Sequence, residues 1–422
     1  MLGIFRTDYM RSVSDKNEKE TAEEWKNVEI NTISCSFAGL SPLVNQFHRY
    51  LQQYKALFSN TPTKGLIEGS ISGDVIPESL AEAVTAWKAS VPLADFTASY
   101  LKTHPEVSSL TPIVLVVIQE GERNTGDQYK LLFSLFERSG VLPLRRTHQQ
   151  IHEHLTLLDH EAGKAPFMVL EKKYVVALVY YRSAYVPSDY EVPGVTTFEE
   201  NPLWQARLHM EQSNAVKCPS IPYHLMTFKK LQQKMTDVDH FLTPYAFNGA
   251  ADKAKTMAQH FVGQYSLNKD EYTTDNKQQQ DPEYYIQQAV AHPERYVLKP
   301  QLEGGGNLIA GETMQSVLTT RKADDATLYH KIRKEYILME KIHYPKVDGT
   351  LFRQEKFYPF EQNVCSELGI YGVVLSDGNT DNKNAYVNRH GGYVVRTKPA
   401  DVEDGGVMAG VACLDSALLL ED

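Results

Sequence analysis

The chain has 422 residues, of which 42% are hydrophobic and 23% charged, and its formal net charge is −10. This composition is typical of a globular protein long enough for two or more lobes, and the acidic balance excludes a general nucleic-acid binder, which would need a basic face. The four cysteines lie far apart without a Cys-x-x-Cys pair, which excludes a disulfide scaffold and argues against structural zinc.

The N-terminal residues lack the apolar core of a signal peptide, and no run approaches the roughly 18 apolar residues of a membrane span. We therefore expect a soluble protein of a reducing compartment, the cytoplasm. The polar residues 11–27 predict a loop or hairpin tip, and 28–34 a short strand. A helix-rich segment is expected from 41 to about 101.

Two apolar runs of strand length, at 111–120 and 174–182, predict strands that are buried on both faces of a sheet. A polar loop follows the first run, and a helical pattern begins near Tyr129, which gives the strand–loop–helix unit of an α/β domain. Ligands of open α/β sheets bind at the carboxyl ends of the strands. The candidate residues at these ends are Glu122, Asn124, Gln128, Arg182 and Tyr185.

The second half of the chain changes from helical to β-rich. Residues 226–293 are predicted to be mostly helical, and the polar tract 266–285 to be an exposed connection in which Asp281 and Pro282 suit a helix start. Strands bounded by Gly, Asn or Asp are then expected at 295–300, 335–342, 363–375, 384–388 and 392–398.

A glycine-rich stretch, KPQLEGGGN, follows the first of these strands. Three adjacent glycines allow backbone amides to approach a ligand closely, and phosphate is the commonest such ligand. A lysine before the loop adds a charge for phosphate, and an acid beside it can hold Mg²⁺. The residues concerned are Lys299, Glu303, Gly304, Gly305 and Gly306. The spacing fits neither a P-loop nor a dinucleotide fingerprint, and a mobile surface hairpin is the alternative.

Glu29 and Asn31 alternate along a β-like run, so their side chains share one face, where an acid and an amide can hold a cation; an ordinary polar edge is the alternative. Arg182 with Tyr185 could form a carboxylate clamp or an ordinary surface. Arg396 and Lys398 also alternate on a strand and precede a second glycine cluster at 404–412, which favours an anion site.

Three histidines, His148, His152 and His154, include a pair at helical spacing that could bind zinc. The segment is polar throughout and has no HExxH pattern, which favours a solvated face. The four cysteines have no context for nucleophilic catalysis and are interpreted as packing residues or incidental thiols.

Nine strings in the chain together resemble eukaryotic-type glutathione synthetase, a member of the ATP-grasp ligases. They cover essentially the whole chain in family order: RTDY, VEINTISCSF, ERNTGDQ, YYRSAYVP, NAVKCPS, KPQLEGGGN, YILMEKI, CSELGIYGV and RTKPADVEDGGVMAGVACLD. The resemblance implies an α/β (α+β) ATP-grasp fold with an inserted parallel α/β substrate-binding domain and glycine-rich lids. It divides the chain into 1–105, the start of the catalytic body, 106–215, the substrate domain, and 216–422, the ATP-grasp region with lids at 299–312 and 400–412.

The resemblance also implies roles for individual residues. The Mg²⁺ ligands would be Glu29, Asn31 and Glu303. The ATP contacts would be Lys217, Lys299, Glu303, Gly304, Gly305, Gly306, Asn307, Met339, Glu340, Lys341, Ile342, Glu367 and Lys398. The peptide-substrate contacts would be Arg6, Ser34, Ser36, Glu122, Asn124, Gln128, Arg182, Tyr185, Arg396, Val407 and Met408. The catalytic candidates are Arg396, Arg6 and Lys299.

The implied reaction is acyl activation: ATP phosphorylates the cysteinyl carboxylate of γ-glutamylcysteine, glycine's amine attacks the acyl phosphate, and phosphate leaves. Phosphoryl transfer needs positioning and charge neutralisation more than a protein nucleophile. The partners are then small molecules, with no nucleic acid or membrane, and the family is typically homodimeric. A further expectation is that Arg396 stabilises charge in the transition state.

The chain departs from the family pattern in the phosphate flap, where Leu302, Leu308 and Ala310 replace an arginine, an asparagine and a tyrosine. The match also begins almost at Met1, whereas the family carries a further N-terminal region, so a short form or a fragment with exposed apolar surface is expected. Two alternatives to an active glutathione synthetase stay open. One is a non-catalytic paralogue that binds nucleotide or a partner subunit, and the other is a ligase for another acceptor, since Met408 stands where a small residue is usual.

Overall fold

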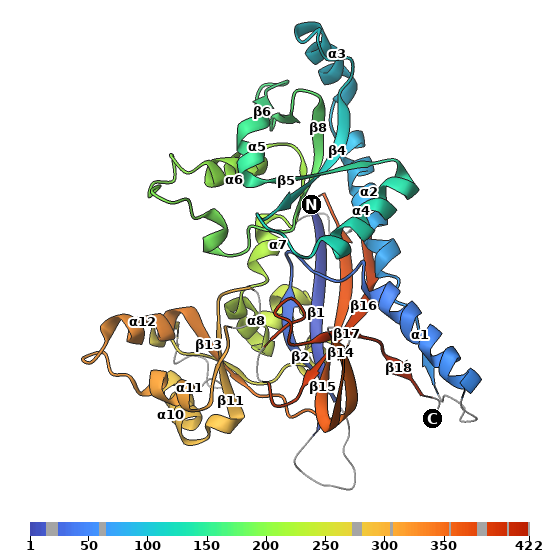
Figure 1. Cartoon of the computed structure of the whole chain (residues 1–422). Helices are drawn as coiled ribbons and strands as arrows, with labels where there is room; N and C mark the ends of the chain where they lie inside the picture. The colour runs from blue at the N-terminus through green and yellow to red at the C-terminus, as the bar shows by residue number, and fades with distance from the viewer. Residues whose placement is uncertain are drawn as a thin grey trace.

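The computed structural model describes residues 1–13, 24–58, 65–271, 281–303, 307–353, 356–377, 386–402 and 405–420. It is a mixed α/β fold, as expected, and it contains three main sheets (Figure 1). The predicted glycines Gly304, Gly305 and Gly306 lie outside the described residues, as do most of the expected loop at 11–27 and part of the lid at 400–412.

The central sheet joins the two ends of the chain. Its strand order is β17 (Cys413–Asp415), β16 (Val387–Pro399), β15 (Lys356–Leu375), β1 (Leu2–Ser12) and β2 (Glu24–Asn31), and β14 (Val347–Arg353) pairs with β15. Every pairing is antiparallel, and Leu2 lies opposite Leu375. The predicted strands at 384–388 and 392–398 are wrong in one respect, because the backbone continues through Gly392, at φ +92°, and residues 387–388 and 392–398 belong to the single strand β16.

A Cβ at position 392 would meet the backbone nitrogen of Ser72 at 2.5 Å, so only glycine fits this close approach of β16 to α2 (Ser72–Ser90). The expected helix-rich segment is confirmed by α1 (Ser41–Phe58), α2 and α3 (Leu93–Thr103). Beside α1, the short strands β3 (Leu66–Ile67) and β18 (Leu418–Leu419) form a two-stranded pair. In α2, Ile76, Leu80, Val84 and Trp87 recur at helical spacing and are fully or almost fully buried in the largest core.

The second sheet belongs to an α/β region. Strands β5 (Leu142–Thr147), β4 (Thr111–Ile118) and β8 (Tyr174–Tyr181) are parallel, and β9 (Val216–Cys218) adds a fourth parallel strand beside β8. Strands β7 (Phe167–Leu170) and β6 (Leu155–Leu158) complete the sheet in antiparallel pairing. Both predicted apolar runs are therefore strands, and their continuous burial follows from helices that cover the sheet. The other elements are α4 (Thr125–Ser139), α5 (His148–His154), η1 (Pro187–Tyr190) and α6 (Pro202–Gln212).

The third sheet has the strand order β10 (Gln264–Ser266), β13 (Tyr336–Glu340), β11 (Tyr296–Pro300) and β12 (Ile309–Ala310). Helices α10 (Pro282–Ala291), α11 (Gly311–Thr319) and α12 (Ala326–Glu335) pack with it around a third core. Asp281 caps α10 through the Glu283 N–H, as predicted. The helices α7 (Ile221–Leu225), α8 (Lys229–Met235), η2 (Val238–Ala246) and α9 (Ala251–Ala258) precede β10, and the turns η3 (Lys269–Glu271) and η4 (Pro293–Arg295) flank α10.

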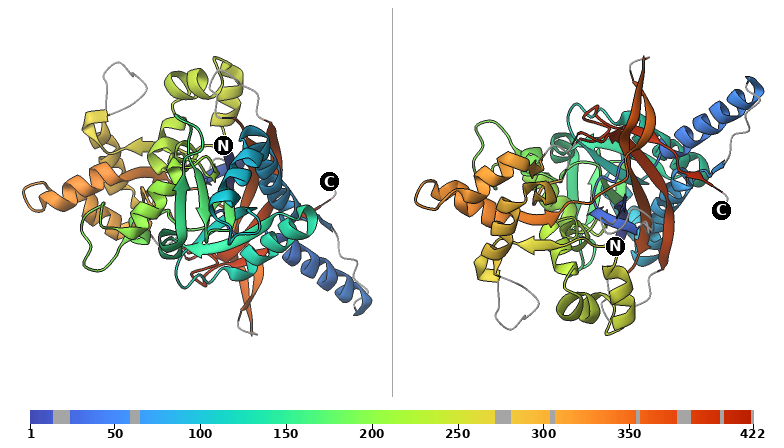
Figure 2. Two further views of the ribbon diagram at one scale, coloured as in Figure 1. Left: turned by 90° about the horizontal axis from the view of Figure 1, so that it is seen from above. Right: turned by 90° about the horizontal axis from the view of Figure 1, so that it is seen from below.

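Both views in Figure 2 place the region of α10 to α12 and the helix α1 on opposite sides of the molecule, with the central sheet between them. Elements from both chain ends and from the third sheet thus meet in the middle. Among the described residues, no helix is both long and apolar enough to span a membrane.

Candidate functional site

A cavity of about 1060 Å³ lies between the central sheet and the third sheet. The central sheet supplies polar side chains because Arg6 and Asp8 alternate on β1, Glu29 and Asn31 on β2, and Arg396 and Lys398 on β16, so each pair lies on one face. The strand register brings these pairs together: Asp8 lies opposite Glu29, Arg6 opposite Asn31, and Glu367 of β15 opposite Arg396.

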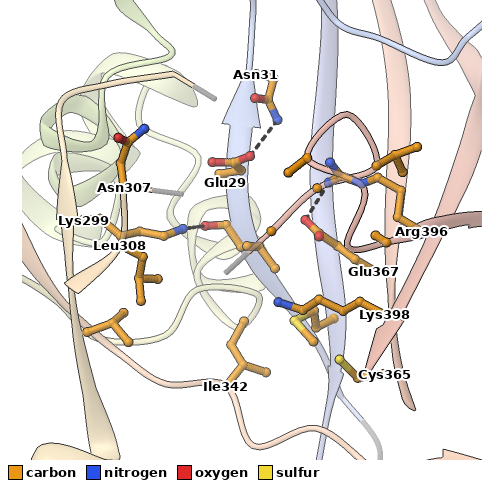
Figure 3. A pocket seen from close by; sticks show the side chains of 18 of the residues that line it. Glu29, Asn31, Lys299, Asn307, Leu308, Ile342, Cys365, Glu367, Arg396 and Lys398 are labelled. Carbon is orange, nitrogen blue, oxygen red and sulfur yellow. Dashed lines mark hydrogen bonds and ion pairs between the residues drawn. The ribbon is translucent and has the colours of Figure 1, made fainter. Parts of the chain in front are cut away.

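The cavity gathers most of the predicted site residues. Those that line it are Arg6, Glu29, Asn31, Ser34, Ser36, Tyr185, Lys299, Glu303, Asn307, Met339, Glu340, Lys341, Ile342, Glu367, Arg396, Lys398, Val407 and Met408. Figure 3 shows Lys299, Asn307 and Leu308 on the side of the third sheet, and Glu367, Arg396 and Lys398 on the side of the central sheet, with Glu29 and Asn31 between them. Most of the residues predicted from separate sequence strings therefore lie around one cavity.

Asp8, which sequence reasoning missed, organises the arginines of the site. Its carboxylate is fully buried and accepts from Arg6 Nε at 2.7 Å, Arg6 Nη2 at 2.8 Å, Arg396 Nη2 at 2.7 Å and Asn31 Nδ2 at 2.8 Å. Arg396 Nη2 also meets Glu367 Oε1 at 2.8 Å. Asp8 stands two residues from Arg6 on a strand, so the alternation of β1 was a signal that could have identified it.

Arg396 keeps one polar group available. Its Nε atom is buried and has no hydrogen-bond partner among the described residues. A buried N–H without a partner is costly unless a ligand supplies one. The arrangement of Arg396 beside Arg6 therefore fits a bound carboxylate or another anion, because guanidinium groups match such ligands.

A second missed residue, Lys229, lies between the two acids of the cavity. Its ammonium is 3.2 Å from Glu29 Oε2 and 2.9 Å from Glu303 Oε1, and its side chain is buried. Burial alone would raise the pKa of Glu29, but Lys229, Lys299 and the site arginines hold that pKa well below its usual range. The Glu29 carboxylate is therefore ionised, which suits a cation ligand.

Contrary to the prediction, Lys217 does not line the cavity. It stands on β9, where it pairs with Val179 of β8, and its ammonium donates to the Ser213 carbonyl oxygen. Burial lowers the pKa of Lys217 to about 8. The prediction that Lys217 contacts ATP therefore has no geometric support, and Lys229 stands where a lysine was expected.

Arg182 is also placed differently from the predicted carboxylate clamp. Its guanidinium is 1% exposed and donates to the Cys35 carbonyl oxygen at 2.7 Å and to Ser36 Oγ at 3.0 Å. Asp127 Oδ2 lies 3.5 Å from it and also accepts from the Phe37 N–H at 2.8 Å. Arg182 and Asp127 thus fix the backbone of the loop at 34–37, and the serines of that loop line the cavity.

The remaining predicted substrate residues, Glu122, Asn124 and Gln128, lie at the carboxyl end of β4 and at the start of α4, as expected. Glu122 accepts from the Asn124 N–H at 2.6 Å and from Gln128 Nε2 at 2.9 Å. Glu122 thus links the other two, Gln128 also accepts from Arg145 Nη2 at 3.0 Å, and none of the three lines the cavity. Arg123, from the same loop, does line it and donates to the Met408 carbonyl oxygen at 3.4 Å.

Other predictions about the polar residues have mixed outcomes. Burial raises the pKa of Cys35 to about 12, and Cys35, Cys218 and Cys365 are buried free thiols, in agreement with a packing role. His152 and His154 are exposed, but His148 is buried, so the predicted solvated face is wrong for His148. No group of three or more His, Cys, Asp or Glu side chains could hold a metal in the described part of the chain.

Comparison with known proteins agrees with this geometry. The family model of the eukaryotic glutathione synthase ATP-binding domain matches residues 1–419. The chloroplastic glutathione synthetase of Solanum lycopersicum is 34% identical over 99% of this chain and 64% of its own length, and the glutathione synthetase of Dictyostelium discoideum is 32% identical over 99% of this chain and 76% of its own. The chain thus spans less than two thirds of the tomato protein.

A solved structure has the same fold. It is a glutathione synthetase-like effector of Globodera pallida in its apo form, with a TM-score of 0.65 and 18% sequence identity over 99% of this chain and 76% of its own. The match of the family model over nearly the whole length, together with the convergence of the ordered strings on one cavity, carries the assignment. The chain belongs to the eukaryotic glutathione synthase family.

Proposed function

We propose that the chain is an ATP-dependent ligase that joins γ-glutamylcysteine and glycine to glutathione. The observation that carries this proposal is the cavity itself, in which an acidic pair, several lysines and two arginines from distant strands face one another. Such a site can bind a nucleotide through its phosphates and place a carboxylate beside them. Phosphoryl transfer requires this positioning and charge neutralisation more than a nucleophile of the protein.

The donor set of Glu29, Asn31 and Glu303 fits Mg²⁺, because all three can offer hard oxygen ligands within one buried space that is already built around a cation, the Lys229 ammonium. When bound, the ion would neutralise phosphate oxygens. Lys299, Lys229 and Lys398 would contribute further positive charge near the phosphates, and the 339–342 segment would form a wall for the nucleotide.

Arg6 and Arg396 would bind and orient the carboxylate of the cysteinyl group, since Asp8 holds both guanidinium groups in place. The carboxylate takes up a phosphoryl group from ATP, glycine's amine then attacks the acyl carbon, and phosphate leaves. The segments around 299–312 and 400–412 would exclude water from the acyl phosphate. Arg396 would also stabilise charge that develops during transfer.

Phosphate release tests the proposal directly. Purified chain is supplied with Mg-ATP and γ-glutamylcysteine, with and without glycine, and phosphate and tripeptide are quantified. We expect glycine-dependent release matched by tripeptide. Arg396→Ala should lower kcat/KM for the dipeptide by about 10²- to 10³-fold, the cost of losing one donor to a developing charge. Arg389→Ala is the matched control, because Arg389 is on the same strand but pairs with Glu82 of α2.

Two other candidate functions rest on specific residues. Leu302 and Leu308 line the cavity where the family has polar residues, which favours a non-catalytic paralogue. A folded protein that releases no phosphate would support that candidate. Met408 lines the cavity near the expected acceptor, so β-alanine or serine could replace glycine. Release that is stimulated by one of these amino acids, and not by glycine, would identify such a ligase.

The location and assembly of the chain are also proposals. The resemblance implies a homodimer in the cytoplasm that acts on small molecules and not on nucleic acid or membranes. The tomato relative is named as chloroplastic, so the compartment can differ within the family. Size-exclusion chromatography with light scattering tests the homodimer.

A further inference from the structure

The strongest unexplained feature of the cavity is the buried ammonium of Lys229. Two carboxylates, Glu29 and Glu303, approach it at 3.2 and 2.9 Å, and the Thr227 carbonyl oxygen lies at 3.5 Å. The contact with Glu303 is a hydrogen bond, that with Glu29 is an ion pair, and that with the Thr227 carbonyl oxygen is long. Lys229 thus has two carboxylate partners in the cavity before any ligand is present.

The position of Lys229 is built by the surrounding chain. It is the first residue of α8, and Gln232 one turn later anchors this helix to β2: its Oε1 accepts from the Ile30 N–H at 3.2 Å and its Nε2 donates to the Ile30 carbonyl oxygen at 2.9 Å. Thr227 Oγ1 donates to Glu303 Oε1 at 2.6 Å. A lysine in the first turn of a helix gains nothing from the helix dipole. The carboxylates therefore explain its place better than the stability of α8 does.

A metal ion would need the same oxygens. Glu29 and Glu303 are the acids of the proposed Mg²⁺ site, and Mg²⁺ requires oxygen ligands at about 2.0–2.1 Å. The ammonium holds these oxygens about 1 Å further away, at hydrogen-bond distances. The ammonium takes one oxygen of each carboxylate, Glu29 Oε2 and Glu303 Oε1, so an ion that bridges the two carboxylates through these oxygens competes with Lys229.

We propose that Lys229 is a positioning residue that keeps the two metal-binding carboxylates together in the ligand-free chain, and that Mg²⁺ displaces its ammonium, which then turns to the phosphates. This inference rests on the proposed function for the identity of the metal site. The ammonium would compete with free Mg²⁺ and yet support binding of the nucleotide. If Lys229 simply assisted metal binding, its removal would weaken the binding of free Mg²⁺ as well as that of the nucleotide.

The test compares Lys229→Met with Lys230→Met. Lys230 is the matched control, because it follows directly in α8 but pairs with Glu271 and Ser266 outside the cavity. Mn²⁺ binding is followed by electron paramagnetic resonance, and Mg²⁺ binding by its displacement of Mn²⁺, both without nucleotide. We expect K229M to bind either ion about tenfold more tightly than the wild type, because the competing cation is gone, and to bind ATP more weakly. K230M should match the wild type.

Thermal unfolding supplies a second readout of the same variants. K229M removes the nearest cation from two carboxylates, so its Tm should fall without metal, and Mg²⁺ should raise it by more degrees than it raises the wild-type Tm. Equal or weaker binding of the free ion by K229M would overturn the proposal, as would the absence of metal binding from both proteins.

The wild-type chain gives a measurement that does not depend on folding of the variant. Amine-reactive labelling, followed by mass spectrometry, should modify Lys229 several times more with Mg²⁺ than without it, while Lys230 is labelled equally in both. Unchanged labelling of Lys229 at saturating metal would also overturn the proposal. None of these readouts needs turnover, so failure of the ligase assay and failure of this inference are separate results.

Discussion

Two buried polar clusters in this molecule look alike in composition and differ in what they face. The sheet cluster consists of Arg6, Asp8, Asn31, Glu367 and Arg396, and four of its members line the cavity. The domain cluster lies in the α/β region and consists of His148, Tyr181, Tyr190, Arg207 and Glu211. None of its members lines the cavity.

The domain cluster is as well connected as the sheet cluster. Arg207 Nε meets Glu211 Oε1 at 2.9 Å, its guanidinium lies 4.0 Å from the centre of the Tyr181 ring, and Tyr181 donates to Glu211 at 2.9 Å. Burial of charge and a shifted pKa therefore do not identify a functional site by themselves. The difference that matters is access to a cavity, and variants can measure it.

The largest effect is expected at Asp8. Asp8→Asn removes the charge that compensates Arg6 and Arg396, so we expect the free energy of unfolding to fall by about 3–5 kcal/mol and kcat/KM to fall with it. Chemical denaturation and steady-state kinetics measure the two losses. Asp74→Asn is the control, because the Asp74–Arg138 pair is more than half exposed and contributes little. Unchanged kinetics in a folded D8N variant would contradict a functional role for the sheet cluster.

Arg207→Met should separate the two clusters. The variant removes the partner of Glu211 and Tyr190, so we expect a loss of about 1–3 kcal/mol of stability. No change is expected in kcat or in KM, because Arg207 does not line the cavity of the candidate site. A drop in kcat/KM comparable to that of D8N would contradict the comparison, and kinetics measured well below the Tm would exclude unfolding as its cause.

His148 gives the domain cluster a pH dependence. Burial, and secondly the charge of Arg207, lower the pKa of His148 from 6.5 to about 4. Between these values the unfolded chain binds more protons than the folded one, so stability rises with pH across this window and is lost as pH falls from 6.5 towards 4. His148→Asn should remove up to about 3 kcal/mol of the stability loss between pH 6.5 and pH 4, and so flatten the slope.

Urea denaturation at several pH values measures that slope. A residual slope is expected in H148N, since burial also lowers the pKa of His224 to about 4. The exposed His152 on the same helix is the control: His152→Asn should leave the slope as it is. An identical slope in H148N and the wild type would show that His148 is not the titrating group.

The smallest effect is expected in the phosphate flap. Leu308→Asn restores an amide where the family has one, and a single hydrogen bond is worth about 0.5–1.5 kcal/mol. We expect KM for ATP to fall by about two- to tenfold, with kcat little changed. The half-exposed Leu225 lies outside the cavity, and Leu225→Asn serves as the control. A rise in KM would mean that this wall of the cavity is suited to an apolar group.

Much of the fold followed from local pattern. The apolar runs at 111–120 and 174–182 are strands because every residue there can be buried, and Glu29 and Asn31 share a face because strands alternate. Asp281 and Pro282 begin a helix where local hydrogen bonding requires it. Such features depend on residues that are close together in the chain, so they can be predicted from a single sequence.

The errors came from long-range packing. Lys217 lies on the short strand β9 and Lys229 on the short helix α8, and the local sequence does not distinguish them. Lys229 reaches the cavity because Gln232 docks α8 on β2. The strand that precedes Arg182 predicts its position but not that the loop at 34–37 covers its guanidinium. His148 begins a short polar helix, and its burial depends on Tyr190, 42 residues later.

The pairing of β1 with β15 has a consequence for biosynthesis. Arg6 lies opposite Tyr371, so the sheet that carries the site joins the beginning of the chain to a segment near its end. At about 5–20 residues per second, a ribosome needs tens of seconds to make the intervening chain. During this time β1 can pair with β2 but has no β15 on its other edge. Completion of the site is therefore a late event that follows translation of β15 and β16.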